Sequence, residues 1–105
     1  MAIHDVYRHL STVNLTVASS AGAATSTAVF PAQTYIVRLC AIGAPTSTSG
    51  VRFAIGNAPT ADSTSAFLPL GWVEYVKVTS GQKLSALGND SVAPASGLNI
   101  VLLSD

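Results

Sequence analysis

The sequence predicts an all-β protein, built as a single antiparallel β-sandwich of about eight short strands with jelly-roll or immunoglobulin-like topology. Apolar and polar residues alternate with a period of two in short segments, as strands require. These segments follow one another at intervals of about 8 to 15 residues, and turn-forming Gly, Pro, Asn and Ser separate them. No long helical pattern lies between them, and 105 residues fit one domain.

The N-terminal segment differs from the rest of the chain. Its apolar residues fall at i, i+3, i+4 and i+7, on one face of a helix: Ile3, Val6, Tyr7 and Leu10. So short a helix is marginal in water by itself. Such a helix docks on its own domain, on a sister subunit or on another protein, or else it frays. We expect residues 1–12 to form an arm with a short helix that docks on a partner, and residues 13–105 to form the sandwich.

The first half of the sandwich is expected to contain four strands, at residues 13–17, 25–30, 35–42 and 51–55. Pro31 ends the second of them because proline cannot donate a ladder hydrogen bond. Residues 35–42 are apolar on both faces apart from Arg38, which indicates a central strand or one covered on its outer side.

The second half is expected to contain four more strands, at residues 66–70, 72–78, 83–87 and 98–103. Pro69 lies inside the first of these, which indicates an edge strand or a bulge. Ser80-Gly81 is typical of a turn, so residues 72–78 and 83–87 are expected to form a hairpin. The last strand places alternate apolar residues on one face.

The charge of the chain is low and balanced. Charged residues make up 10% of the chain and the net charge is zero, against roughly 25% charged residues in an ordinary domain. Without a basic stripe or a long apolar run, we expect no nucleic-acid partner and no membrane span. Near-neutral surfaces tend to associate. The composition thus fits a protein covered in an assembly, and equally a small neutral domain rich in Ser and Thr.

The sequence contains no recognisable catalytic, metal or cofactor site. His4 and His9 are five residues apart, and Asp5 is the only nearby acid, so a zinc set is incomplete. The five carboxylates are scattered along the chain, which predicts neither a glycosidase pair nor a calcium site. Cys40 lies in an apolar run and is expected to be a small buried hydrophobe. The prediction is a protein that is not an enzyme.

Two pairs of side chains can have a role on the surface. Trp72 and Tyr75 can form a stacking platform, or one of them can belong to the core. Arg38 and Arg52 point away from the expected core face and can pair with Glu74 across the sheet, where an exposed pair contributes little.

Four segments in the second half of the chain carry a resemblance: VRFAIGNAPTA, FLPLG, VEYVKVTSGQKLSAL and GLNIVLLSD. In this order they resemble small virion proteins of tailed bacteriophages. The resemblance implies a β-sandwich that decorates or cements a capsid, made in the host cytoplasm and located in the virion. It implies as partners the major capsid protein or another virion protein, and further copies of the chain in a dimer or trimer.

The residues expected to make these contacts fall in two groups. The arm is expected to bind through Ile3, Val6, Tyr7 and Leu10. The sheet is expected to bind through Tyr35, Val37, Arg38, Trp72 and Tyr75. The alternative is a module that binds glycans or a host surface through Trp72, Tyr75 and either Asp62 or Asn57.

Overall fold

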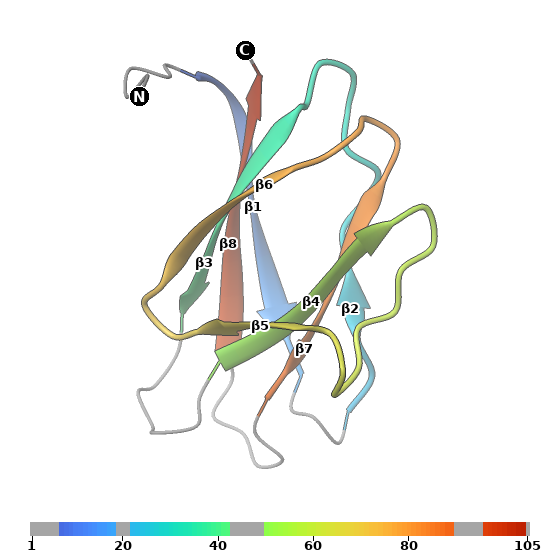
Figure 1. The fold of residues 1–105 in the computed structure, drawn as a ribbon, viewed down its shortest axis with the longest axis vertical. Helices are drawn as coiled ribbons and strands as arrows, with labels where there is room; N and C mark the ends of the chain where they lie inside the picture. Colours follow the sequence, from blue (N-terminus) through green and yellow to red (C-terminus); the bar gives the residue numbers. More distant parts are fainter. Residues whose placement is uncertain (1–6, 19–21, 43–49, 90–95, 105) are drawn as a thin grey trace.

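The computed structural model describes residues 7–18, 22–42, 50–89 and 96–104. Eight strands form two four-stranded antiparallel sheets, which pack face to face (Figure 1). The predicted all-β sandwich is confirmed. Sheet A has the order β1 (Arg8–Val17), β8 (Ser96–Ser104), β3 (Ile36–Ile42) and β6 (Val73–Lys77). Sheet B has the order β2 (Thr25–Ser26), β7 (Lys83–Gly88), β4 (Gly50–Gly56) and β5 (Ala66–Pro69).

The strand pairing is nested along the chain. Strand β1 pairs with β8, β2 with β7, β3 with β6, and β4 with β5, all antiparallel. The pairs β3–β8 and β4–β7 join these ribbons into the two sheets. This is the order of an eight-stranded jelly roll, because a long hairpin rolled up on itself produces it. Of the two predicted topologies, the jelly roll is therefore the one observed, and the immunoglobulin order is not.

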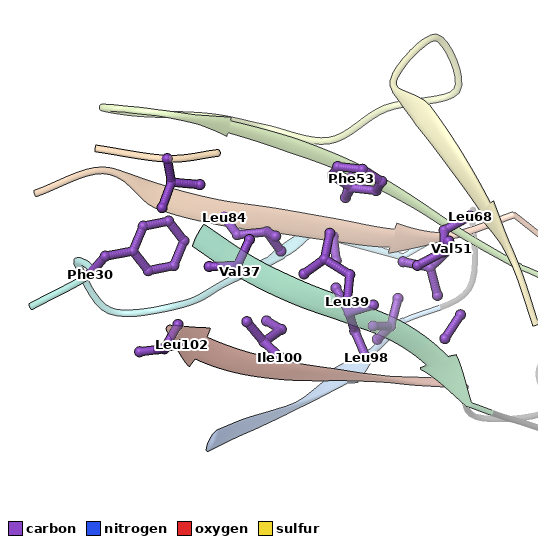
Figure 2. Close-up of a cluster of buried hydrophobic side chains, with 14 residues drawn as sticks. Phe30, Val37, Leu39, Val51, Phe53, Leu68, Leu84, Leu98, Ile100 and Leu102 are labelled. Carbon is purple, nitrogen blue, oxygen red and sulfur yellow. The ribbon is translucent and has the colours of Figure 1, made fainter. Parts of the chain in front are cut away.

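The core lies between the sheets and follows the period-2 pattern of the strands. Figure 2 shows side chains from both sheets meeting in this layer, among them Leu39 of β3, Leu84 of β7 and Ile100 of β8. These three side chains are fully buried. Burying a leucine or isoleucine in this way contributes about 1.5–3 kcal/mol. The expectation that β8 turns alternate apolar residues to one face is confirmed, since Leu98 and Leu102 are buried beside Ile100.

The predicted N-terminal helix is wrong for the part of the arm that the structure describes. Strand β1 begins at Arg8 and pairs with β8 from its first residue. The register shifts between His9 and Ser11, so that Leu10 falls in a bulge and packs against the core. The bulge breaks strict alternation, and the spacing of Tyr7 and Leu10 therefore resembles a helical one. Ile3 and Val6 lie outside the described residues.

Two predictions about neighbouring strands are also wrong. Strand β2 has two residues rather than six. The chain after it still runs beside β7, with Thr27 N–H donating to Leu84 O (2.8 Å) and Phe30 N–H donating to Gln82 O (2.8 Å). Strands β6 and β7 form no hairpin, because β6 pairs with β3 in sheet A whereas β7 lies in sheet B. The turn between them therefore joins the two sheets.

A tight turn carries the chain from β5 in sheet B to β6 in sheet A. Trp72 N–H donates to Pro69 O (3.2 Å) and closes the turn. Gly71 has a φ of 80°, which the third position of a type II turn requires and glycine adopts without strain. Gly71 N–H also donates to Ala41 O (2.9 Å) and ties the turn to β3. The turn thereby fixes the point at which β6 joins the edge of sheet A.

Candidate assembly surface at strand β6

Strand β6 is an edge strand of sheet A, and within the described residues no strand pairs with its outer side. Val78, just after β6, donates its N–H to Tyr35 O (2.8 Å), toward β3. Alternate residues of a strand direct their backbone groups to opposite edges. Val73, Tyr75 and Lys77 therefore direct their N–H and C=O groups outward, away from β3.

The side chains around β6 form an exposed apolar surface, which we call the β6 patch. Its members are the exposed large hydrophobic residues at this edge of sheet A: Ile42, Trp72, Val73 and Tyr75. Val73 and Tyr75 lie opposite Cys40 and Arg38 on the outer face of the sheet, in phase with Ile42. Trp72 directly precedes the strand and is 65% exposed. One sheet edge thus combines unpaired backbone groups with exposed apolar side chains.

The rings of Tyr7 and Tyr75 contact each other, with centroids 6.3 Å apart and planes inclined by 37°. Tyr7 precedes β1, while Tyr75 belongs to β6, and these are the two edge strands of sheet A. The contact therefore links the two edges across the outer face of the sheet. Tyr75 is still 56% exposed, so more than half of its surface is open to a partner.

The structure brings together only some of the residues that the sequence predicted for the sheet interface. Trp72 and Tyr75 lie in the β6 patch, and Arg38 is half-buried opposite Tyr75. Val37 is fully buried in the core, so its assignment to a partner contact is wrong; alternation places it on the opposite face from Arg38. Tyr35 is exposed, but it lies before β3 at one end of the sandwich.

Sequence reasoning missed two members of the β6 patch. Val73 lies two residues before Tyr75 in the same strand, so its side chain is on the same face of the sheet. This period-2 spacing could have identified Val73 from the sequence. Ile42 has the same phase as Arg38 and is 54% exposed. The arm residue Leu10 is partly buried and packs against the core of its own chain.

Arg52 is engaged within sheet B. Its Nε donates to Asn89 Oδ1 (3.1 Å), one guanidinium nitrogen donates to Ser65 O (3.1 Å), and its guanidinium carbon lies 4.8 Å from the centre of the Phe67 ring. Glu74 belongs to sheet A, so the predicted pairing with Arg52 is wrong. Arg52 instead links the start of β5 to the chain just after β7.

The loop between β4 and β5 is organised by Asp62. Its Oδ1 accepts hydrogen bonds from Thr64 N–H (2.8 Å), Thr64 Oγ1 (2.6 Å) and Ser65 Oγ (3.4 Å). The Thr64 hydroxyl, followed by the other donors, lowers the pKa of Asp62 below its ordinary value. Asp62 and Asn57 belong to this loop of sheet B, whereas Trp72 and Tyr75 lie at β6 of sheet A (Figure 1). The predicted glycan patch, Trp72 and Tyr75 with either Asp62 or Asn57, is therefore divided between the two sheets.

Cys40 and His9 have ordinary structural surroundings. Cys40 is half-buried on the outer face of sheet A opposite Val73, so the prediction of a core cysteine is wrong. His9 Nε2 lies 3.1 Å from Thr12 Oγ1. Among the described residues, no three His, Cys, Asp or Glu side chains gather in a metal-binding group. That same part of the chain contains no helix of the length and hydropathy needed to cross a membrane.

Comparisons with known proteins give no relative for this chain. No family model, no curated protein and no solved structure matches it.

Proposed function

We propose that this chain is a non-enzymatic structural protein of a phage virion, which decorates the capsid and associates with a second copy of itself through β6. The observation that carries the proposal is the open edge of β6 beside the apolar β6 patch. Open strand edges pair readily with another strand. The jelly-roll fold, common in capsid proteins, and the segments that resemble virion proteins support the capsid role.

Backbone pairing selects one register for the two copies of β6. When Tyr75 lies opposite Tyr75 of the second copy, Val73 lies opposite Lys77, and Glu74 lies opposite Val76. All outward-facing residues of β6 then form hydrogen-bonded pairs, and the two aromatic rings meet at the two-fold axis. The contact is isologous, as in most homodimers.

Neighbouring registers are less favourable. A shift that places Glu74 opposite Glu74 of the second copy brings two carboxylates together. A shift in the other direction places Val76 opposite itself and leaves Val73 without a partner residue in β6. The zero net charge of the chain adds little repulsion between copies.

Sedimentation velocity of the purified chain tests the pairing. We expect a concentration-dependent dimer for the unchanged chain and a monomer for Tyr75→Asp, which places two carboxylates at the axis. Val29→Asp is the matched control, because Val29 is 54% exposed but lies after β2, and this variant is expected to dimerise normally. A monomeric unchanged chain, or a trimer, would contradict the two-fold pairing.

The capsid role needs a separate test. In a lysate of the source, the chain is expected to sediment with megadalton particles. Mass spectrometry of the gradient fractions detects the chain. The Tyr75→Asp variant is expected to reach a lower occupancy on these particles. If the unchanged chain stays at small multiples of its 10.7 kDa mass, the virion role is wrong, even where the dimer forms.

A further inference from the structure

One end of the sandwich contains a cavity of about 300 Å³, lined by Arg8, Gln33, Tyr35 and Ser104. The start of β1, the end of β8 and the loop leading into β3 meet at the upper end of the molecule in Figure 1. Arg8 lies opposite Ser104 in the β1–β8 register, and Tyr35 N–H donates to Leu103 O (3.0 Å). Paired backbone therefore places three of these side chains beside one another.

Three of the polar side chains around this cavity, those of Arg8, Gln33 and Tyr35, are available to a ligand. Within the part of the chain that the structure describes, no hydrogen bond or ion pair engages the guanidinium of Arg8, the amide of Gln33 or the phenol of Tyr35. The described lining residues include one cation and no carboxylate. In a chain with five Lys and Arg residues, one of its few cations thus faces a cavity whose described lining residues carry no counter-charge.

Gln33 adopts a conformation that favours glycine. Its φ is 71°, and it follows Ala32 in a turn closed by Thr34 N–H, which donates to Pro31 O (3.3 Å). Gly or Asn usually occupies this turn position, because other side chains are strained there. The next residue, Thr34, is fully buried, and its hydroxyl has no hydrogen-bond partner. Residues with strained backbone conformations are concentrated at functional sites. Here the residue with the positive φ, Gln33, contributes its amide side chain to the lining of the cavity.

We propose that this cavity binds an acidic sugar, a single monosaccharide unit that carries a carboxylate at the end of a glycan. The guanidinium of Arg8 suits the carboxylate, since it can donate two parallel hydrogen bonds. Tyr35 is 44% exposed and offers an aromatic face to the sugar C–H groups. The Gln33 amide both donates to and accepts from hydroxyl groups.

The size of the cavity sets the size of the ligand. Ligand pockets span about 300–1,000 Å³, and this cavity lies at the lower limit. One sugar ring is therefore expected to occupy it, while the rest of the glycan extends into solvent. This site is separate from β6, so it assigns glycan binding to a different place from the Trp72 and Tyr75 pair.

The test is a titration of the full-length ¹⁵N-labelled chain with glucuronate, followed by amide chemical shifts in NMR spectra. We expect saturable shifts at the residues that line the cavity and little response to glucose or to acetate. An equal response to glucose would overturn the role of the carboxylate, and an equal response to acetate would overturn the role of the sugar. No response at these residues would overturn the site itself.

Two variants separate binding from folding. Arg8→Gln is expected to weaken glucuronate binding at least tenfold, whereas Lys83→Gln removes a cation outside the cavity lining and is expected to leave binding unchanged. Gln33→Gly relieves the strained φ and removes the amide. This variant is therefore expected to keep or raise the melting temperature while it weakens binding. Unchanged binding in both Arg8→Gln and Gln33→Gly would contradict the proposal.

Discussion

Strands β5 and β6 follow each other in the chain, and each forms the edge of a different sheet. Strand β5 has four residues, one of which is Pro69, and proline blocks pairing with a further strand. Its Phe67 lies under the guanidinium of Arg52, at 4.8 Å from the ring centre. Strand β6 has five residues, no proline, and exposed Val73 and Tyr75.

The difference shows that exposure of a sheet edge is not uniform within one small domain. Natural proteins protect edges with proline, charge, short strands or covering side chains. Strand β5 has several of these features, and β2 is protected by its length of two residues. On β6 only Glu74 and Lys77 oppose pairing, and the proposed register keeps the two copies of Glu74 apart. The proposed pairing of two copies would cover this open edge together with the apolar side chains beside it.

The largest expected effect comes from breaking the protected edge. In Gly50→Ala, the added Cβ would overlap the ring of Phe67 and lie 2.7 Å from Leu68 O, which is backbone that cannot move aside cheaply. We expect a loss of about 1–3 kcal/mol in the free energy of unfolding. Urea denaturation measures it, and Gly56→Ala is the control because its Cβ would meet nothing within 4 Å. Equal losses in both variants would contradict the close packing of β4 on β5.

The second prediction concerns a variant that introduces a proline into β6, as β5 has at Pro69. Val73→Pro removes an N–H group that points away from β3, so the ladder with β3 is expected to survive. The dimer would lose two hydrogen bonds, one from each copy, at about 1 kcal/mol each, which weakens dimerisation about 30-fold. Sedimentation equilibrium measures the change. Val76→Pro is the contrast, because its N–H points toward β3 and its loss is expected to destabilise the fold itself.

The third prediction concerns the ring contact that crosses sheet A. Tyr7→Ala removes the partner of Tyr75 and is expected to cost about 0.5–1.5 kcal/mol of folding stability. Thermal unfolding of Tyr7→Ala, Tyr75→Ala and the double variant measures the coupling between the rings. Purely additive losses would mean that the two rings stabilise the fold independently.

The smallest expected effect lies in the loop that leads into β5. The hydrogen bond from the Thr64 hydroxyl, and then the other donors, lower the pKa of Asp62 below its ordinary value. The hydrogen-bonded carboxylate therefore stabilises the loop above that pH, and this contribution is lost as the pH falls through the lowered pKa. Amide shifts of Thr64 and Ser65 should titrate with a midpoint below that of an aspartate in an unstructured peptide, and Asp62→Asn should abolish the step. A midpoint at or above that of the peptide aspartate would contradict the hydrogen-bond pattern.

Period-2 patterns predicted most of the strands because each buried face is regular. The strand at residues 98–103 was identified with its core face, and Pro69 marked β5 as an edge. Strand partners were not predictable in the same way. Residues 72–78 and 83–87 are close in sequence and are separated by turn-forming residues, which suggests a hairpin. In a sandwich, a turn of the same composition can instead connect strands of different sheets, as it does here.

The candidate site was predictable only in part. Trp72 and Tyr75 were identified because large aromatic residues near a strand are conspicuous. Val37 was assigned to the wrong face because residues 35–42 are apolar on both sides and alternation gives no phase there. The cavity at Arg8 and Gln33 joins residues from three separate segments, and its turn carries no glycine to mark the positive φ.

The nested pairing of the strands has a consequence for synthesis of the protein on the ribosome. Strand β8 lies between β1 and β3 in sheet A, and it is translated after the other seven strands. Until it emerges, β1 has no partner in its sheet, and both β1 and β3 expose an edge that aggregates easily. The domain therefore cannot complete its fold until residues 96–104 have left the ribosome. A nascent chain paused before residue 96 should bind chaperones that release it once β8 has left the exit tunnel.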